Sequence, residues 1–411
     1  MRTEILHPLR LPQFRRVWIG QALSALGDGV FPVVLAAAVL SHGSASDLGF
    51  VLGAESLVLV CTVLLGGVLA DRMRRSRAML IADLLRLAAV AGFALGAHQL
   101  PLAVPMALAA VMGLGTGLFR PASQALLPSL APGLLTQANA LQSLTSRTGL
   151  IAGPALGGLL FAIAGSSAAF WFDAATYLVS VLTLLRIRDA RPERTNEAGV
   201  IAEAKEGIRT VLKRPWVAVI IAQGTVQLVF VMAPALVLLP IYLNEQGRMN
   251  AYGLMIGLQA AGSVVGGLLV GIRKPRNPGL VGVLGLSLVG LQLLVMLLAL
   301  PIPMLAAAMV LTGSGYALFG VLWASALQES IPNELLGRVF AVETLGTYAL
   351  EPVGLVLAPV LTGIVGLSSV LVVAVAFVVL TTVVPLLVPG VRRFADPDRV
   401  PVSAHASQPV C

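Results

Sequence analysis

The sequence predicts an all-α polytopic membrane protein with twelve transmembrane helices arranged as two six-helix halves. Of its 411 residues, 57% are hydrophobic and 11% are charged, whereas soluble domains carry roughly 25% charged residues. Apolar runs long enough to cross a bilayer as helices alternate with short polar turns. Basic residues fall in every second turn, and sequence motifs of the first half recur in the second.

The expected spans follow one another along the chain with short connections. They are 17–40, 48–70, 78–97, 101–120, 139–164, 167–186, 216–243, 251–272, 279–299, 302–326, 338–364 and 367–390. With the N-terminus inside, the outside turns hold only one basic residue, Arg248. The positive-inside rule then places both termini in the cytoplasm. We therefore expect a multi-pass protein of the cell (inner or cytoplasmic) membrane.

Composition divides the chain into four segments. The first six-helix half is 1–186, a basic linker is 187–215, the second half is 216–390, and the tail is 391–411. In the linker, apolar residues recur at helical spacing, which fits an amphipathic helix on the membrane surface and equally a partly ordered basic linker. The tail is rich in Pro, Ser and Ala, so we expect it to be disordered.

The two halves repeat in order. The pattern Gly-x-Gly-x-x-Leu-Phe begins at Gly113 and again at Gly313, and a Leu-Leu pair begins at Leu134 and again at Leu335. These offsets agree with each other, which predicts two halves in parallel orientation related by a pseudo-two-fold axis along the membrane normal. A substrate cavity is expected between them near the midplane.

Several classes of function are excluded. The net charge of +8 resides in loops between spans, so it does not indicate nucleic-acid binding. The cysteines, Cys61 and Cys411, form no metal motif, and the four histidines are dispersed. No phosphate-binding sequence is present. We expect a protein that is not an enzyme and holds no metal or cofactor, with a proton gradient as its energy source.

Ionisable residues inside spans are costly, so they are candidates for function. Asp28 and Glu351 fall near the midplane, and Glu55 falls in the outer third of its span. We expect these acids to line a substrate cavity and carry protons. Asp28, between two glycines, also suits a polar role in helix packing, and Glu351 equally suits hydrogen bonds to backbone freed by the following proline or a cationic substrate.

Four further charged residues share one depth, one to two turns inside the cytoplasmic boundary: Asp83, Arg86, Arg147 and Glu343. Asp83 and Arg86 are spaced to pair on one helix. The common depth predicts a salt-bridge cluster, either structural or an inner gate that breaks during a transport cycle. Asp173 follows two aromatic residues, so we expect it at the outer interface.

Two glycine-containing motifs remain. An apolar helix passes Gly67 and ends in Asp71, Arg72 and a further arginine, Arg75. A carboxylate near the positive end of a neighbouring helix contributes about 0.3 to 2 kcal/mol, enough to bias two nearly equal states. Asp71 is therefore a latch candidate, and the alternative is a solvated loop acid.

The second motif lies in the fifth span and consists of Gly149, Gly153, Pro154, Gly157 and Gly158. Its glycines permit close helix approach, and the proline bends the span. We expect glycines of the eighth span, including those at 262 and 266, to form the facing surface. The alternative is ordinary packing of small residues.

Taken together, these motifs make the chain resemble a transporter of the major facilitator superfamily from Phe14 to Phe394. The loop motif around Asp71 matches the one this family carries between spans two and three. The resemblance implies that Asp71 faces the start of span eleven, near Gly337 and Arg338. The motif of span five matches the pattern typical of drug:proton antiporters in that family.

Within the superfamily, the segment from Phe14 to Asp28 and the segment from Pro332 to Arg338 resemble the prokaryotic exporters that include macrolide-efflux and enterobactin-export proteins. This implies a proton-coupled antiporter that exports a hydrophobic or amphiphilic small molecule, such as a drug, antibiotic, siderophore or other metabolite, by alternating access. Its partners are then the substrate, protons and the lipid bilayer, and it functions as a monomer. The alternatives are a proton-coupled uptake symporter and a membrane sensor that does not transport.

Overall fold

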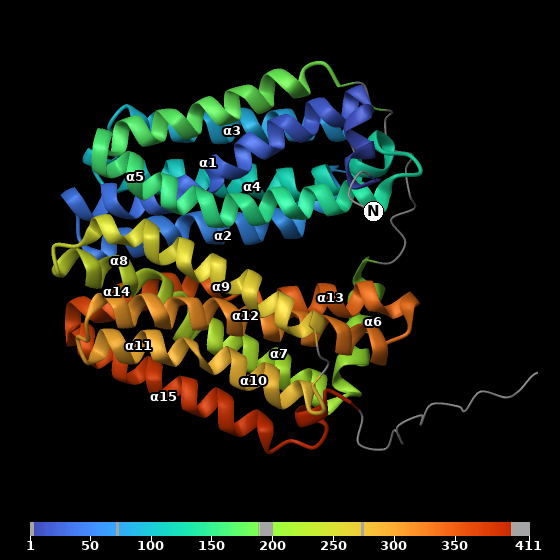
Figure 1. The fold of residues 1–411 in the computed structure, drawn as a ribbon, viewed down its shortest axis with the longest axis vertical. Coiled ribbons are helices and arrows are strands. Elements are labelled where there is room, and N and C mark those ends of the chain that lie inside the picture. Colours follow the sequence, from blue (N-terminus) through green and yellow to red (C-terminus); the bar gives the residue numbers. More distant parts are fainter. Residues whose placement is uncertain (1–3, 71–73, 188, 190–199, 273–274, 396–411) are drawn as a thin grey trace, which may run out of the picture.

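A computed structural model of the chain describes residues 4–70, 74–187, 189, 200–272 and 275–395. Within these ranges every regular element is helical, which confirms the all-α class (Figure 1). Asp71, Arg72 and the tail beyond Ala395 lie outside the described residues.

The first half follows a short 3-10 helix at Glu4–Arg10. Its helices are α1 (Pro12–His42), α2 (Ala45–Ala70), α3 (Arg75–Ala94), α4 (Ala103–Leu130) and α5 (Leu135–Leu184). The last of these contains two spans, because the helix turns back at Gly165, whose φ of 78° lies in the left-handed region. Glycine adopts that region without a steric penalty.

The second half contains six spans, three of which are interrupted. Its helices are α7 (Pro215–Gln227), α8 (Ala233–Glu245), α9 (Tyr252–Ile272), α10 (Pro278–Ser287), α11 (Val289–Leu297), α12 (Ile302–Ser330), α13 (Asn333–Tyr348), α14 (Glu351–Val365) and α15 (Leu367–Leu386). A π-helical turn at Leu228–Met232 joins α7 to α8 in one span. The pairs α10 with α11 and α13 with α14 each form one span as well.

By length and apolarity, ten stretches of the described residues qualify as membrane spans. One of them, Gln137–Leu184, covers both spans of α5. The remaining span is α3, which is too rich in charge to qualify by apolarity alone. Its four charged residues are Arg75, Arg77, Asp83 and Arg86. The twelve predicted spans are thus accounted for.

Glycine packing shows the repeat directly. In the first half, a Cβ added to Gly113 of α4 would collide with the Glu55 carbonyl of α2. In the second, a Cβ added to Gly313 of α12 would collide with the Gln259 carbonyl of α9. The glycine that recurs in sequence therefore makes the same close approach in both halves.

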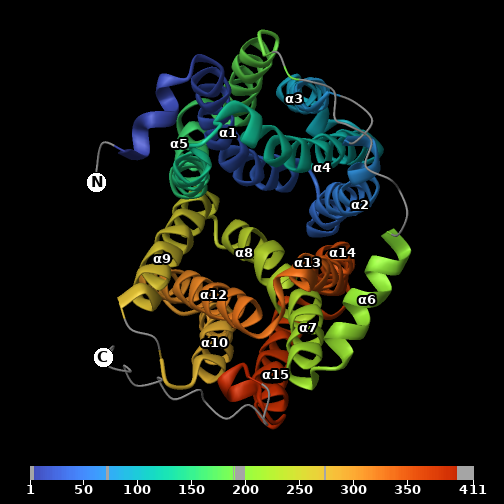
Figure 2. The same cartoon turned by 90° about the vertical axis from the view of Figure 1, so that its right-hand side faces the viewer.

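The two halves lie side by side and touch at one end of the bundle (Figures 1 and 2). We name the two ends by their residues: the basic end carries Arg15, Arg186 and Arg338, and the closed end is opposite. Near the closed end α2 packs against α14, with Gly49 on Pro359. There α5 also packs against α9.

A separate helix, α6 (Val200–Leu212), lies between the halves in sequence and packs against α13 at the basic end (Figure 2). Arg338 of α13 donates from Nη1 to the Glu206 carboxylate of α6. Gly207 allows the close approach, because a Cβ there would lie 2.8 Å from the Arg338 carbonyl oxygen. The linker helix is thus attached to the second half.

Candidate functional site

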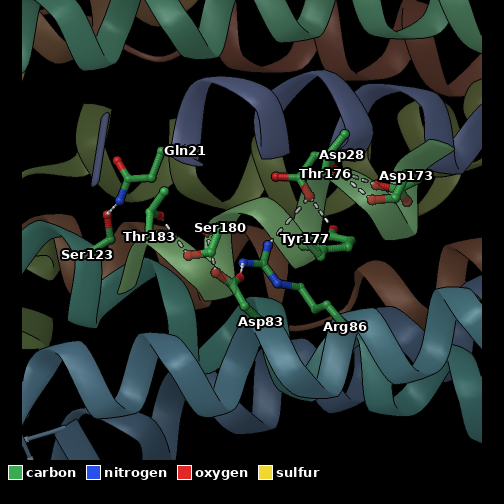
Figure 3. Close-up of polar contacts among 10 residues, drawn as sticks. All are labelled: Gln21, Asp28, Asp83, Arg86, Ser123, Asp173, Thr176, Tyr177, Ser180 and Thr183. Atoms are coloured by element: carbon green, nitrogen blue, oxygen red, sulfur yellow. Dashed lines mark hydrogen bonds and ion pairs between the residues drawn. The ribbon is translucent and has the colours of Figure 1, made fainter. Parts of the chain in front are cut away.

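An ion-pair cluster occupies the core of the first half (Figure 3). Arg86 of α3 is 2% exposed, and its Nη2 donates to Oδ1 of Asp83, which is 0% exposed. Its Nη1 lies 3.5 Å from Oδ1 of Asp28 on α1. One guanidinium therefore joins two carboxylates from two helices.

Side chains of α5 complete the cluster. The Tyr177 hydroxyl donates to Asp28, and the Ser180 hydroxyl donates to Oδ2 of Asp83 at 2.6 Å. The Arg86 guanidinium carbon lies 4.7 Å from the centroid of the Tyr177 ring and 4.3 Å from that of Phe119 on α4. Aromatic faces attract such a cation, so four helices hold the Arg86 charge in place.

Asp173 is a buried member that the sequence analysis misplaced. It is 0% exposed, and a Cβ on Gly27 of α1 would collide with its Oδ1. Its Oδ2 has no hydrogen-bond partner among the described residues. The expectation of an interfacial position was wrong, because its aromatic neighbours in sequence point elsewhere on the helix. The spacing of residues 173, 177 and 180 on one helical face was the available signal.

Exposure distinguishes the three aspartates. Asp28 is 46% exposed at its side chain, whereas Asp83 and Asp173 are both fully buried. Two carboxylates contact the guanidinium and Asp173 lies near them, so the group carries excess negative charge when all three are ionised. Unpaired charges are costly in such surroundings. Asp28 is therefore the aspartate of the cluster that solvent reaches.

The three predicted cavity acids fall in two places. Asp28 belongs to the first-half cluster, whereas Glu55 of α2 and Glu351 of α14 interact across the boundary between the halves. Ser56 donates to Oε2 of Glu351 at 3.4 Å. Arg120 of α4 also acts electrostatically on both glutamates. This second acidic site therefore depends on contact between the halves.

The predicted cluster of four charges must be corrected. Asp83 and Arg86 pair as expected, but Asp28 takes the further position on the guanidinium. Among the described residues, no ion pair joins Arg147 or Glu343 to them. Arg147 is exposed on the cavity wall, and Glu343 receives hydrogen bonds from Trp323 and Thr344 within the second half. The cavity separates the two halves at this depth.

That cavity has a volume of about 770 Å³ and lies between the halves toward the basic end. The first half contributes α1, α4 and α5, and the second contributes α9 and α12. Its wall mixes apolar side chains with amides and hydroxyls, including Gln21, whose Nε2 donates to the Ser123 hydroxyl at 2.9 Å. Such a surface suits an amphiphilic ligand.

The structure describes only some residues of the loop motif around Asp71 and of the facing start of span eleven, which together form the predicted cytoplasmic gate. Gly67 lies in α2 and Gly337 in α13, while Asp71 and Arg72 fall outside the described residues. Arg75 donates from Nη1 to the Ala125 carbonyl of α4 at 2.6 Å. It therefore ties α3 to α4, as Arg338 ties α13 to α6.

The glycine motif of the fifth span has two contact faces on α5. Gly149, Gly153 and Gly157 approach the backbone of α1, and a Cβ on Gly153 would lie 2.6 Å from the Gly29 Cα. Gly158 faces the second half, where its Cβ would lie 3.2 Å from the Gly253 Cα of α9. Pro154 adjoins this second face, because its carbonyl contacts Gly253.

The predicted partner surface on the eighth span was wrong. Gly262 and Gly266 pack against the backbone of α12, within their own half. Gly257 and Gly253, about one and two turns earlier in α9, are the residues that contact α5. Sequence showed which helices are rich in glycine, but not which face of each helix turns toward the other half.

Twelve membrane spans in two repeats, a cavity between the two halves, and charged residues buried in the core of the first half define a membrane transporter. Residues 17–349 match the family model of the Major Facilitator Superfamily. The chain belongs to this superfamily, and it is a multi-pass membrane transporter and not an enzyme.

Two curated relatives cover nearly the whole chain. The chain is 30% identical to the multidrug efflux pump Tap of Mycobacterium tuberculosis, over 93% of this chain and 96% of that protein. It is 27% identical to the enterobactin exporter EntS of Citrobacter koseri, over 96% of each. Both resemblances agree with the exporter group indicated by the sequence.

Solved structures share the fold. A mutant of the nucleoside transporter NupG superposes with a TM-score of 0.74 at 12% identity, covering 91% of this chain and 99% of that one. A bacterial homologue of the iron transporter ferroportin, in an inward-facing state, gives 0.69 at 20% identity, covering 92% and 98%. These similarities confirm the two-half architecture.

Proposed function

We propose that the chain exports hydrophobic or amphiphilic small molecules in exchange for protons by alternating access. The basic end faces the cytoplasm, since lysine and arginine collect in cytoplasmic loops. Both termini are then cytoplasmic, and the 770 Å³ cavity is open to the cytoplasm. The observation that carries the proposal is the half-exposed Asp28, which is bonded to the fully buried Arg86.

Asp28 links proton binding to helix packing. As a carboxylate it accepts the Tyr177 hydroxyl bond and attracts Arg86, so it holds α1 against α3 and α5. A proton on Asp28 removes the charge that Arg86 attracts and leaves the guanidinium to Asp83. The packing of α1 therefore differs between the two protonation states, and a difference of this kind shifts a two-state equilibrium.

The relatives support the direction and the class of substrate. Tap is named for multidrug efflux and EntS for enterobactin export. Each of these functions moves an organic molecule outward. We propose the same direction here, in the cell membrane, with a monomer as the working unit and the proton gradient as the energy source without a cofactor.

Everted membrane vesicles test the proposal. Their cytoplasmic face is outside, so an added substrate enters the open cavity directly. We expect members of a panel of amphiphilic compounds to discharge a preset proton gradient in vesicles that contain the protein and not in vesicles that lack it. An uptake symporter would instead require substrate on the opposite face, and that result would reverse the proposed direction.

A further inference from the structure

A second, smaller cavity lies within the second half. Its volume is about 180 Å³, and most of its wall is apolar, including Met232, Leu236 and Met309. Four of its lining residues carry polar groups: Gln259, Gln292, Tyr316 and Glu351. An apolar pocket with a few convergent polar groups is the usual form of a small-molecule site.

Gln292 presents an unused acceptor in this pocket. Its side chain is 2% exposed, and its Nε2 donates to the Ala235 carbonyl at 3.2 Å. A carbonyl only accepts, so this bond fixes which end of the amide faces Ala235. The remaining atom, Oε1, is buried without a hydrogen-bond partner among the described residues. A ligand that donates a hydrogen bond would satisfy it.

Glu351 adds negative charge to the same wall. It receives the weak Ser56 hydrogen bond and lies close enough to Glu55 for the two carboxylates to interact. No lysine or arginine is among the described residues that line the pocket. Arg120 acts on Glu351 from α4 in the other half. The pocket therefore presents one unpartnered amide oxygen and one carboxylate to a ligand, with no lysine or arginine among its described lining residues.

We propose that this pocket binds the protonated amine of an amphiphilic substrate, with the N–H groups donating to Gln292 and Glu351. This rests on the proposed transport function and adds the substrate class. At about 180 Å³ the pocket holds only a head group, since drug-sized ligands occupy roughly 300 to 1,000 Å³. Tyr316 lines both this pocket and the 770 Å³ cavity. The apolar body of the same molecule extends past Tyr316 into the larger cavity.

A matched pair of probes tests the charge requirement. Dansylcadaverine carries a primary amine that is protonated at pH 7, because amines of this kind have pKa values near 10. Its N-acetyl derivative has the same fluorescent body without the charge. We expect the full-length protein in lipid nanodiscs to bind the amine at least tenfold more tightly than the acetylated probe, as measured by dansyl fluorescence against empty nanodiscs.

Variants locate the site. Gln292→Leu should weaken amine binding about tenfold, and Glu351→Gln should remove the preference for the amine over its acetylated form. Gln223→Leu is the matched control: Gln223 is also a buried glutamine with an unpartnered Oε1, but it lies outside the pocket. It should bind both probes as the unmodified protein does. Size-exclusion chromatography reports whether each variant is folded, and the conservative Glu351→Gln change tests the site even if Gln292→Leu does not fold.

Equal affinity of the unmodified protein for both probes would overturn the proposal, as would an equal loss in Gln223→Leu and Gln292→Leu. Binding at equilibrium needs no proton gradient. A failure here therefore leaves the vesicle test of proton-driven export standing, and a failure of that test leaves the binding result intact.

Discussion

At the scale of single residues, Asp28 and Arg86 differ in what they face. Arg86 is enclosed by Asp83, Phe119 and Tyr177, so its charge is fixed by the fold. Asp28 contacts the same guanidinium from a half-exposed position. The position of the Arg86 cation is thus fixed by its surroundings, whereas the Asp28 carboxylate remains in contact with solvent.

Asp28→Asn should abolish coupling while the protein still folds, because the amide keeps the shape of the side chain but takes up no proton. We expect transport driven by an imposed pH gradient in proteoliposomes to fall at least tenfold. Asp47→Asn is a matched control, since Asp47 is an exposed acid that caps the start of α2 through Ser44. Unchanged pH-driven flux in Asp28→Asn would remove Asp28 from the mechanism.

Arg86→Leu should destabilise the protein severely. Removing one partner of a buried ion pair leaves the other charge unpaired, which costs about 3–5 kcal/mol. Here Asp83 would remain buried without its cation. Thermal unfolding of the purified variant measures the loss, with Arg147→Leu as the control because Arg147 is exposed and unpaired among the described residues. Similar midpoints for both variants would contradict this account, and Asp83→Asn should partly rescue Arg86→Leu.

The lowered pKa of His98 leads us to expect that stability depends on pH. His98 lies outside the spans, in the turn between α3 and α4, where burial and the nearby His42 lower its pKa below the ordinary 6.5, opposed by a hydrogen bond to the Phe93 carbonyl. The unfolded chain therefore binds more protons than the folded one at pH values below about 6.5. The free energy of unfolding should fall as the pH drops from 7 toward 5.

Denaturant unfolding at several pH values measures this slope. His98→Asn should reduce it, because the titrating group is gone. His7→Asn, at the opposite end of the bundle, should leave it unchanged. An identical slope in the unmodified protein and in His98→Asn would show that burial of His98 contributes nothing to the pH dependence.

At the scale of elements, α5 shows how one helix serves two contacts. Gly149, Gly153 and Gly157 hold it against α1, and Gly158 meets Gly253 of the other half. The first contact is within a half and belongs to the fold. The second is between halves, so it must change if the closed end is to open.

Gly153→Ala should lower the thermal midpoint markedly. Its Cβ would lie 2.6 Å from the Gly29 Cα and 2.8 Å from the Leu26 carbonyl oxygen, and backbone atoms cannot move aside as a flexible side chain can. Gly267→Ala is the control, because a Cβ there meets nothing within 4 Å. We expect that control to be neutral or slightly stabilising, since alanine favours helix. A neutral Gly153→Ala would contradict the close α1–α5 packing.

Sequence predicted the elements well where a local property decides them. Apolar length and turn residues located the spans, including the return at Gly165 between spans five and six. Contacts that depend on the rotation of a helix about its axis were harder to predict from the sequence. Asp173 was assigned to an interface, and Arg147 to a cluster, because depth along a helix can be counted from sequence whereas the face that meets a neighbour cannot.

At the scale of the whole molecule, the two repeats share packing but differ in charge. The first half buries the charged side chains of Asp83, Arg86 and Asp173, whereas the polar side chains that the second half buries, among the described residues, are amides and hydroxyls. Gln227 is fully buried and donates to the Leu286 carbonyl at 3.3 Å. The glycine motifs of the sequence revealed the offset between the two repeats. Which end of the bundle is closed depends on contacts between the halves, and no local sequence pattern determines those contacts. The charge difference supports our proposal that proton coupling resides in the first half.

Proton release on substrate binding tests this account most directly. Purified protein in weakly buffered solution is mixed with a transported compound, and a pH indicator reports protons released. If substrate and proton compete in one cycle, the unmodified protein should release protons when substrate binds, and Asp28→Asn should release none while still binding substrate. Binding without proton release by the unmodified protein, or equal release by Asp28→Asn, would contradict the central claim.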